Sequence, residues 1–266
     1  MAEAGDDLEL LVAAAREAGA LAMTFFRKDP KTWPKGDSSI VSEADIALDQ
    51  LLFSRLTAAR PDYGWLSEET ADDLARLSRE RVFVVDPIDG TRGFLAGGNE
   101  WTVSLAVVEN GYPVAAALFA PSLNLMFEAK AGRGATRNGR PMQVSPRQEL
   151  AGASVAGSKR LIRDALEIGG VSLDYYGFVT SLAYRFALVA AGEVDAGIAR
   201  AGSHDWDLAA ADLLVHEAKG RLADLAGNRP RYNEREPRHP TLLATNSALG
   251  DAMAELVEKA DKAQAK

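Results

Sequence analysis

The sequence contains no cysteine and only three histidines among its 266 residues. The missing thiols exclude disulfide bonds and thiolate metal centres, and three scattered histidines do not make a zinc site. No apolar run approaches the ~20 residues that a helix needs to cross a bilayer, so we expect no membrane span. The start of the chain is acidic and lacks the basic residues that open a secretory signal, so we expect a cytoplasmic location.

The chain also has fewer basic than acidic residues. The 30 Lys and Arg are outnumbered by 38 Asp and Glu, which gives a formal net charge of −8. This balance argues against a surface that coats a nucleic-acid polymer. A small phosphorylated ligand stays possible, because bound Mg²⁺ can locally invert the sign of an acidic pocket. At 47% hydrophobic and 26% charged, the composition is that of an ordinary globular protein with a sizeable core.

Helical and strand-like patterns alternate along the chain, which indicates an α/β fold. We expect helices over 8–26, 46–59, 161–168 and 208–219. Strands are expected over 82–85, 101–108, 114–119, 125–129, 154–157 and 183–191, and a loop over 28–39. Asn-Gly pairs at 110–111 and 138–139 predict hairpin turns. A change of pattern near 140–150 divides the chain into an α+β half, residues 1–145, and an α/β half, residues 146–266.

The most informative segment is 82–91, with the sequence VFVVDPIDGT. Its β-branched run, 82–85, predicts a buried strand. We expect Pro87 to end this strand and Gly90 to allow a tight turn after it. This arrangement places two carboxylates, Asp86 and Asp89, beside the Ile88 carbonyl and the Thr91 hydroxyl. Hard oxygen ligands of this kind suit Mg²⁺. The same residue types also make ordinary polar turns, so the segment alone leaves both interpretations open.

Three further acidic segments carry weaker signals. Asp205 and Asp207 precede an apolar helical pattern, where either could simply cap the helix. Glu68 belongs to a pair of glutamates, an arrangement that is usually solvated surface. Ser42 and Asp45 open another helical pattern, as an N-cap and part of an acidic first turn. Each segment therefore has an ordinary structural explanation as well as a chemical one.

Taken together, these segments fall in the order of a known family. Lys35, VSEAD at 41–45, SEE at 67–69, DPIDGT at 86–91 and WDLAA at 206–210 resemble the motifs of the inositol monophosphatase superfamily. That superfamily consists of Mg²⁺-dependent, lithium-sensitive phosphatases. The resemblance extends along nearly the whole chain. It implies a layered α/β/α/β/α sandwich with the active site between the two halves, and a homodimer.

The resemblance also implies roles for individual residues. Two or three Mg²⁺ ions would be held by Glu68, Asp86, the Ile88 carbonyl, Asp89 and Asp207. The catalytic residues would be Glu68, Asp45 and Thr91, with Thr91 oriented by Asp45 to relay the proton of the attacking water. The expected substrate contacts are Asp89, Gly90, Thr91, Ser181, Arg200 and Asp207.

The leaving group is the harder question. Inositol-specific members carry a glutamate seven residues before the terminal aspartate of the last motif, and this position is Arg200 here. An arginine cannot accept a hydrogen bond from a sugar hydroxyl, but it can bind a second phosphate in bidentate fashion. An ordinary surface arginine at a strand end fits the position equally well.

Other segments, at 66–77, 91–94 and 231–233, resemble bacterial CysQ-type 3'(2'),5'-bisphosphate nucleotidases. Those enzymes remove the 3'-phosphate from adenosine 3',5'-bisphosphate. Arg92-Gly93 and Tyr184-Arg185 depart from that subfamily and leave the nucleotide selectivity open. The alternatives are an inositol-1-monophosphatase, a phosphatase of another sugar or amino-alcohol phosphate, and a non-catalytic relative that binds a phosphorylated ligand.

Overall fold

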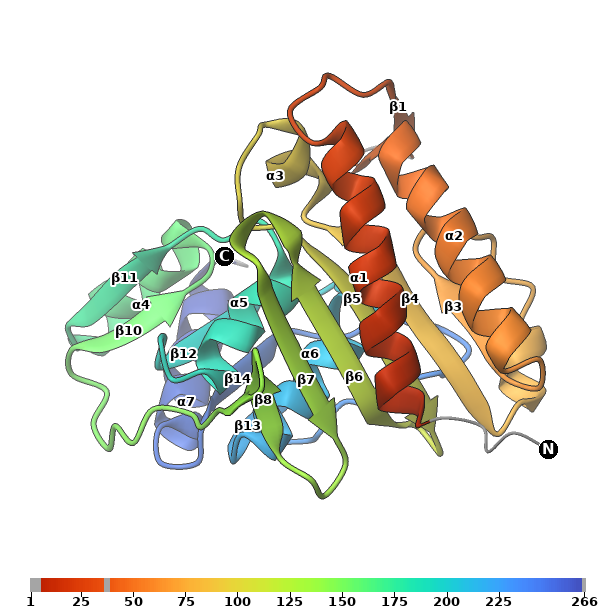
Figure 1. Cartoon of the computed structure of the whole chain (residues 1–266). Helices are drawn as coiled ribbons and strands as arrows, with labels where there is room; N and C mark the ends of the chain where they lie inside the picture. The colour runs from red at the N-terminus through yellow and green to blue at the C-terminus, as the bar shows by residue number, and fades with distance from the viewer. Residues whose placement is uncertain (1–5, 36–38, 265–266) are drawn as a thin grey trace.

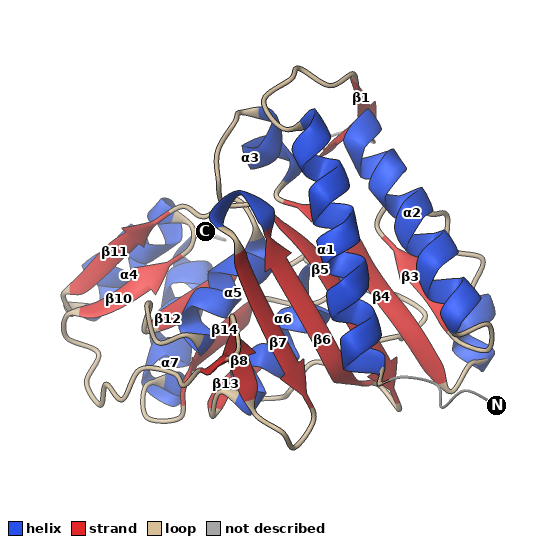
Figure 2. Cartoon of the chain, in the orientation of Figure 1, coloured by secondary structure: helices blue, strands red, loops and turns tan. Residues whose placement is uncertain are grey.

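Helices and sheets alternate in five layers (Figure 1). The structure is a computed structural model that describes residues 6–35 and 39–264. Residues 1–5, which carry part of the acidic start, lie outside the described residues. The first layer consists of α1 (Asp7–Phe25) and α2 (Glu43–Ala59), which lie side by side across one face of the larger sheet (Figure 2).

The larger sheet forms the second layer and has seven strands. Their order in the sheet is β3 (Gly64–Ser67), β4 (Arg81–Asp89), β5 (Thr102–Glu109), β6 (Tyr112–Ala120), β7 (Leu125–Lys130), β8 (Ala135–Arg137) and β9 (Arg140–Pro141). Strands β3 and β4 pair in parallel and all the other neighbours are antiparallel. A short helix, α3 (Thr91–Leu95), follows β4 directly.

The middle layer is the helix pair α5 (Leu182–Ala190) and α6 (Asp205–Glu217), which packs between the two sheets. The smaller sheet has five strands in the order β11 (Leu173–Gly177), β10 (Ala153–Ala156), β12 (Ala196–Ala199), β14 (Leu242–Asn246) and β13 (Gly220–Asp224). Its outer face is covered by α4 (Lys159–Gly169) and α7 (Gly250–Gln264). The predicted α/β/α/β/α sandwich is therefore confirmed.

The alternation of side chains along β4 and β5 builds two hydrophobic cores from one sheet. Phe83 and Val85 point toward α1 and α2, whereas Val82 and Val84 point toward α5 and α6. Successive strand residues face opposite sides, and helices cover both sides, so the strand is apolar throughout. Each fully buried side chain of this kind contributes about 1.5–3 kcal/mol to folding.

Two expectations about secondary structure were wrong. The segment 183–191, expected as a strand, is helical up to Ala190 as part of α5, with Ala191 as the C-cap, and its side chains are buried from Ala183 to Ala190. A helix enclosed between two sheets has no polar face, so its sequence lacks the helical periodicity that would identify it. The expected loop 28–39 contains β1 (Thr32–Lys35), which pairs antiparallel with β2 (Ser39–Ser42), while residues 36–38 lie outside the described part.

Both predicted hairpin turns are confirmed, with positive φ at Asn110 and Gly111 and at Asn138 and Gly139. None of the helices in the described part of the chain combines the length and the hydropathy of a membrane span. The two sheets are built from residues 64–141 and 153–246 respectively. The division of the chain into two halves near residue 145 stays a prediction.

Candidate active site

A cavity of about 230 Å³ lies where the first three layers meet. It is bounded by the end of β4, the start of α3, the start of α6, and the segment that leads from β11 into α5. The residues that line it are Ile40, Glu68, Asp86, Ile88, Asp89, Gly90, Thr91, Arg92, Phe178, Thr180 and Asp207. The cavity thus collects most of the site residues that the sequence predicted.

A β-bulge in β4 brings Asp86 and Asp89 onto one face of the sheet. Asp86 pairs with Ser104 and Asp89 with Thr102, so three steps along β4 oppose two steps along β5. In a regular strand, residues three apart point to opposite faces, and the one extra residue restores the same side. The proline expected to end the strand lies inside this bulge, where no ladder donor is required.

The three aspartates Asp86, Asp89 and Asp207 form one cluster. Each offers a carboxylate oxygen, and these oxygens lie within 4.8 Å of one another, close enough to hold a metal ion. Asp207 comes from the first turn of α6, where its Oδ2 also accepts a hydrogen bond of 2.7 Å from the His204 amide. The helix-cap explanation and the metal-ligand explanation for Asp207 are therefore compatible. Asp205, in contrast, binds buried His239 at 2.7 Å.

Asp89 is held from the other side by the start of α5. Its Oδ2 accepts hydrogen bonds from the Ser181 hydroxyl at 2.6 Å and the Ala183 amide at 2.7 Å. Its Oδ1 accepts a third from the Leu182 amide at 3.2 Å. A carboxylate is favoured at a helix N-terminus, where the first amides lack partners within the helix. Ser181 is fully buried behind Asp89, so we assign it to holding that carboxylate instead of the substrate contact that the resemblance implied.

The Thr91 hydroxyl and Asp45 are paired across two elements. Thr91 Oγ1 lies 3.0 Å from Asp45 Oδ1 and 3.0 Å from the Ile88 carbonyl oxygen. Asp45 itself is fixed by a capping box, because its Oδ2 accepts bonds from the Ser42 amide and hydroxyl at 2.8 and 2.5 Å. Gly90 has a φ of 95°, a conformation that favours glycine, and it turns the chain from β4 into α3. The hydroxyl is thereby held with two acceptors within reach.

Glu68 and its neighbour Glu69 are partly buried beside a lysine instead of being fully solvated. The Lys35 ammonium lies 2.9 Å from Glu69 Oε2 and 3.6 Å from Glu68 Oε1. It also donates a hydrogen bond of 2.5 Å to the Glu68 carbonyl oxygen. A cation of the protein therefore already lies at the edge of the acidic cluster.

Burial and mutual repulsion raise the pKa values of this cluster. Burial, reinforced by the surrounding carboxylates, holds the pKa values of Asp86 and Asp207 well above the usual range. Burial raises the pKa of Glu68 to about 7, against the opposing effect of Lys35. For Asp89, burial raises the pKa while the hydrogen bonds from Ser181 and two amides lower it. Carboxylates buried this closely need protons or a cation to neutralise them.

Two arginines differ from what the sequence indicated. Arg200 follows β12, is exposed, and is outside the cavity lining. Arg92, in the first turn of α3, is the basic residue among the described residues that line the cavity. Its signal in the sequence was its place directly after Thr91. Ile40, Phe178 and Thr180 also line the cavity and had no local signal, because they come from segments distant in the chain.

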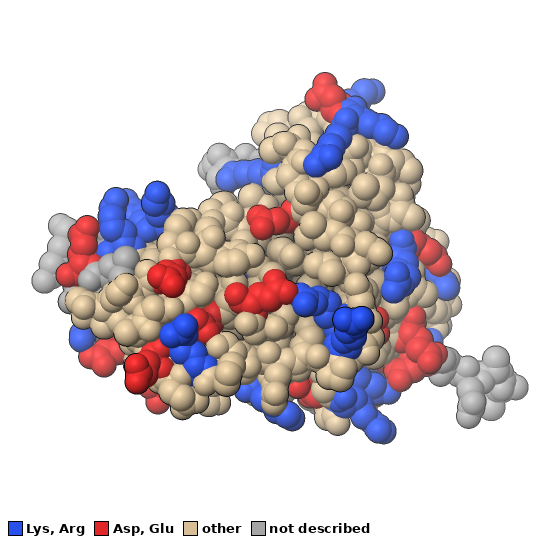
Figure 3. Space-filling view, turned by 60° about the vertical axis from the view of Figure 1, so that its left-hand side comes forward, with Lys and Arg blue, Asp and Glu red and all other residues tan. Residues whose placement is uncertain are grey.

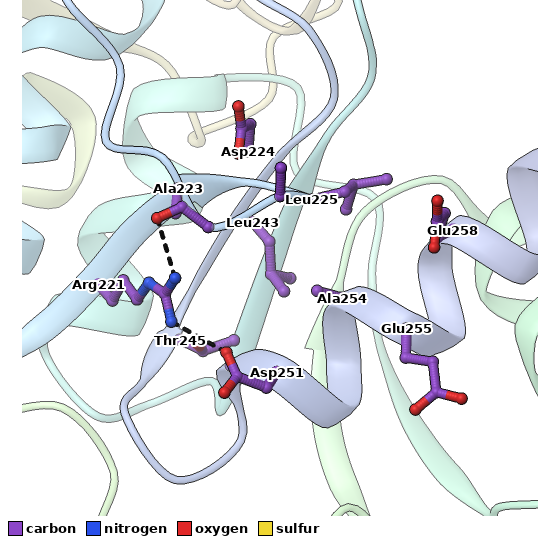
Figure 4. Close-up of a pocket in the computed structure, with 13 residues that line it drawn as sticks. Arg221, Ala223, Asp224, Leu225, Leu243, Thr245, Asp251, Ala254, Glu255 and Glu258 are labelled. Carbon is purple, nitrogen blue, oxygen red and sulfur yellow. Dashed lines mark hydrogen bonds and ion pairs between the residues drawn. The ribbon is translucent and has the colours of Figure 1, made fainter.

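A second cavity, of about 270 Å³, lies between β13, β14 and α7 (Figure 4). Its arginine, Arg221, is bonded to Asp251 at 3.0 Å and to the Gly227 carbonyl oxygen at 2.9 Å. None of the described residues that line it is shared with the cavity that holds the carboxylate cluster. We therefore place the chemistry at the carboxylate cluster.

The sequence model of the inositol monophosphatase family matches residues 6–264. The chain belongs to the inositol monophosphatase family. The members of this family are phosphatases, and the superfamily predicted from the sequence is confirmed. The chain is 32% identical over 264 residues to the Nus factor SuhB of Xylella fastidiosa, with 94% of each chain covered. It is 31% identical to the inositol-1-monophosphatase of Mesorhizobium japonicum, with 95% of this chain and 96% of the other covered.

A solved structure of a family member has the same arrangement of the chain. The inositol monophosphatase of Thermotoga maritima superimposes with a TM-score of 0.85 at 26% identity, covering 97% of this chain and 99% of the other. The SuhB protein of Bartonella henselae superimposes with a TM-score of 0.82 at 28% identity, covering 94% and 98%. The layered fold is thus that of the inositol monophosphatase family.

In this family member, we expect the metal-free protein to lose stability as the pH rises. The pKa of Glu68 is about 7 in the folded state against 4.5 for an ordinary glutamate, so the folded state binds more protons between these values. Stability from such a group is fully present below the lower pKa and is lost as the pH rises through the higher one. Thermal unfolding in a chelator, measured from about pH 5 to about pH 8, should show a falling Tm.

Saturating Mg²⁺ should reverse this loss, since a ligand at a hundred times its Kd stabilises the folded state by about 2.7 kcal/mol. The variant Glu68→Gln serves as the control, because it removes the Glu68 carboxyl and should make the fall of Tm with pH shallower. The fall that remains comes from Asp86 and Asp207, whose pKa values burial also raises. A Tm of the chelated wild-type protein that rises across this pH range would contradict the prediction.

Proposed function

We propose that the chain is a Mg²⁺-dependent phosphomonoesterase that removes the 3'-phosphate from adenosine 3',5'-bisphosphate. The observation that carries the phosphatase assignment is that the Thr91 hydroxyl, bonded to buried Asp45, lines the same cavity as Asp86, Asp89 and Asp207. A protein that only binds a phosphorylated ligand has no chemical need for the Thr91–Asp45 pair. The two features together serve hydrolysis.

The residues present fit Mg²⁺. The donors are hard oxygens and mostly buried, and burial raises the pKa values of Asp86 and Asp207, so a cation would favour their joint ionisation. The residues that would hold two or three ions are Glu68, Asp86, Asp89, Asp207 and, through its carbonyl, Ile88. Bound Mg²⁺ supplies neutralisation of the phosphate oxygens and lowers the pKa of a water molecule.

The chain itself supplies orientation and proton transfer. The Thr91 hydroxyl donates a hydrogen bond to Asp45 or to the Ile88 carbonyl oxygen. As the attacking water gives a proton to the Thr91 oxygen, the hydroxyl's own proton passes to the Asp45 carboxylate. The Gly90 and Thr91 amides precede the first turn of α3, where amides have no acceptor within the helix, and they are suited to the phosphate oxygens. We expect direct attack by water and no phosphorylated enzyme.

The nucleotide assignment rests on the character of the cavity wall. The acidic residues among the described lining residues are Asp86, Asp89 and Asp207, which form the cluster, and Glu68, which we propose as a further metal ligand. An inositol ring carries hydroxyls that call for acceptors outside that cluster, whereas a bisphosphate calls for a second cation. Arg92 lines the cavity and can bind a phosphate in bidentate fashion. We therefore move the proposed second-phosphate contact from Arg200 to Arg92.

The face shown in Figure 3 agrees with a small ligand. Basic and acidic side chains are interspersed on it, without a continuous basic stripe. Together with the net charge of −8, this supports a small phosphorylated substrate over a nucleic-acid polymer as the partner.

The test is phosphate release with Mg²⁺ from adenosine 3',5'-bisphosphate and from inositol 1-phosphate at equal concentration. We expect the nucleotide to be preferred. The variant Arg92→Met should lower kcat/KM for the bisphosphate roughly tenfold to a hundredfold, because a hydrogen bond to a charged group usually contributes that much to binding. The value of kcat/KM for inositol 1-phosphate should change little.

Arg200→Met is the matched control, since that side chain is outside the cavity lining. It should leave kcat/KM for both substrates unchanged. A preference for inositol 1-phosphate would keep the phosphatase and overturn the nucleotide assignment. If neither substrate releases phosphate, the substrate would be another sugar or amino-alcohol phosphate, or the protein would be a relative that binds its ligand without turnover.

A further inference from the structure

Phe178 is a large apolar side chain that the fold leaves exposed at the carboxylate cavity. It is 62% exposed, more than any other large apolar side chain recorded as exposed in the described chain, and it lines the same cavity as Asp89 and Thr91. Single exposed apolar side chains are ordinary on protein surfaces, so exposure alone decides nothing. Its position at the cavity, and the way in which its segment is held, require a further explanation.

The backbone on the C-terminal side of Phe178 is fixed at consecutive residues. The carbonyl oxygen of Val179 accepts a hydrogen bond of 2.6 Å from Arg185, and the Thr180 hydroxyl donates one of 3.0 Å to the Glu100 carbonyl oxygen. Ser181, next in the chain, holds Asp89 at 2.6 Å. The segment that positions a metal ligand therefore also presents Phe178, and the ring is attached to a backbone that is already ordered.

Two close contacts strengthen this arrangement. Helix α3 approaches the segment so closely that a Cβ on Gly93 would lie 2.3 Å from the Thr180 hydroxyl oxygen. The Arg185 guanidinium lies 5.5 Å from the centroid of the Phe178 ring and is itself buried and bonded to the Ile198 carbonyl oxygen at 2.7 Å. A cation at this distance attracts an aromatic ring, so the exposed phenyl group has a fixed support.

The remaining lining shows what such a ring can contact. Outside the carboxylates and Arg92, the described lining residues offer two hydroxyls and otherwise apolar or backbone surface. The Thr180 hydroxyl already donates to the Glu100 carbonyl oxygen, and the Thr91 hydroxyl to Asp45 or the Ile88 carbonyl oxygen. The rest of this lining is Ile40, Ile88, Gly90 and Phe178. This surface has few partners for the hydroxyls of a polyol. A planar base has an apolar face that stacks on an aromatic ring.

We propose that Phe178 is the specificity-determining residue for the leaving group, and that its ring stacks on the base of a nucleotide whose phosphate lies at the carboxylate cluster. This inference rests on the proposed phosphatase function and deepens it. Discrimination between nucleotide and sugar phosphates is thereby assigned to a side chain of the segment that leads from β11 into α5. Ordering of the ring in advance lowers the entropy cost of that contact.

The experiment compares two substrates that differ only in the base. Adenosine 3',5'-bisphosphate carries it, and methyl ribofuranoside 3,5-bisphosphate keeps the sugar and both phosphates without it. The wild-type protein should show a lower KM for the nucleotide, and Phe178→Leu should raise that KM about tenfold or more while leaving the base-free substrate unchanged. The value of kcat should change little for either substrate, since the ring contacts the base and takes no part in the transfer of the phosphate.

Tyr175→Leu is the matched control, because Tyr175 is 37% exposed on β11 and is outside the cavity lining. Tyr175→Leu should leave the KM values of both substrates unchanged. Equal KM values for the two substrates in the wild-type protein, or equal effects of Phe178→Leu on both, would overturn the stacking inference while nucleotide hydrolysis stands. Absence of nucleotide hydrolysis would overturn the proposed nucleotide function and the stacking inference together.

Discussion

Asp89→Asn should abolish Mg²⁺-dependent phosphate release while leaving the fold intact. The substitution keeps the shape of the side chain but removes a charge from the cluster that it forms with Asp86 and Asp207. If the lost metal interaction is worth about 4 kcal/mol of transition-state stabilisation, turnover should fall about a thousandfold. The measurement is kcat/KM for adenosine 3',5'-bisphosphate, together with thermal unfolding in chelator to establish that the variant is folded.

The matched control for this prediction is Asp195→Asn. Asp195 is 8% exposed, and its Oδ2 accepts hydrogen bonds from Arg147 Nε at 2.9 Å and the Ser154 amide at 2.8 Å, outside the cavity lining. The Asp195→Asn variant removes the charge of a carboxylate about as buried as Asp89 that is not a proposed metal ligand. This variant should keep full turnover. Undiminished hydrolysis by a folded Asp89→Asn protein would remove Asp89 from the metal site.

The second large effect is expected for Thr91→Ala. Loss of the hydroxyl that lies 3.0 Å from Asp45 removes the route for the proton of the attacking water, and general acid–base groups of this kind contribute about 10²–10⁴-fold. The loss should appear in kcat, with KM little changed, because the contact matters in the transition state. Thr91→Ser keeps a hydroxyl and should retain most of the rate.

Thr70→Ala provides the comparison for a threonine–aspartate pair elsewhere in the chain. Its hydroxyl donates a hydrogen bond of 2.6 Å to Asp49, and neither residue lines the cavity. That variant should keep its kcat. If Thr91→Ala and Thr91→Ser had the same rate as the wild-type protein, the hydroxyl would have no part in proton transfer.

Some expectations stay predictions. The homodimer implied by the resemblance to the family, the number of Mg²⁺ ions and inhibition by lithium depend on a partner chain or on ions. The metal ligands and the substrate selectivity also await the variants described above. The fold class and the family, in contrast, are confirmed.

The chemistry of the site was accessible from sequence wherever its residues are close together in the chain. Asp86, Asp89 and Thr91 are within one segment of six residues, and Ser42 and Asp45 within one helix start. Local geometry largely determines how such neighbours are presented, because a bulge, a tight turn or a helix cap involves only a few residues. These groups could therefore be predicted as a set of oxygen ligands and a proton relay.

Tertiary packing decided the rest. Ser181 contacts Asp89 across 92 positions of the chain, and whether it faces a ligand or a carboxylate depends on how α5 enters the space between the two sheets. The helical state of 183–191 has the same origin, since burial on every side removes the polar face that marks a helix in sequence.

The cavity wall shows the same division. Arg92 lines it and Arg200 does not, although the resemblance to the family pointed to Arg200 as a candidate. Phe178 lines the cavity of the carboxylate cluster because the middle helices pack between the two sheets, an arrangement that no local pattern encodes. Sequence by itself determined the family and the oxygen-bearing residues predicted as ligands, because those follow from residue type and short-range geometry. The structure alone decided which distant side chains surround them, because long-range contacts depend on the packing of whole layers.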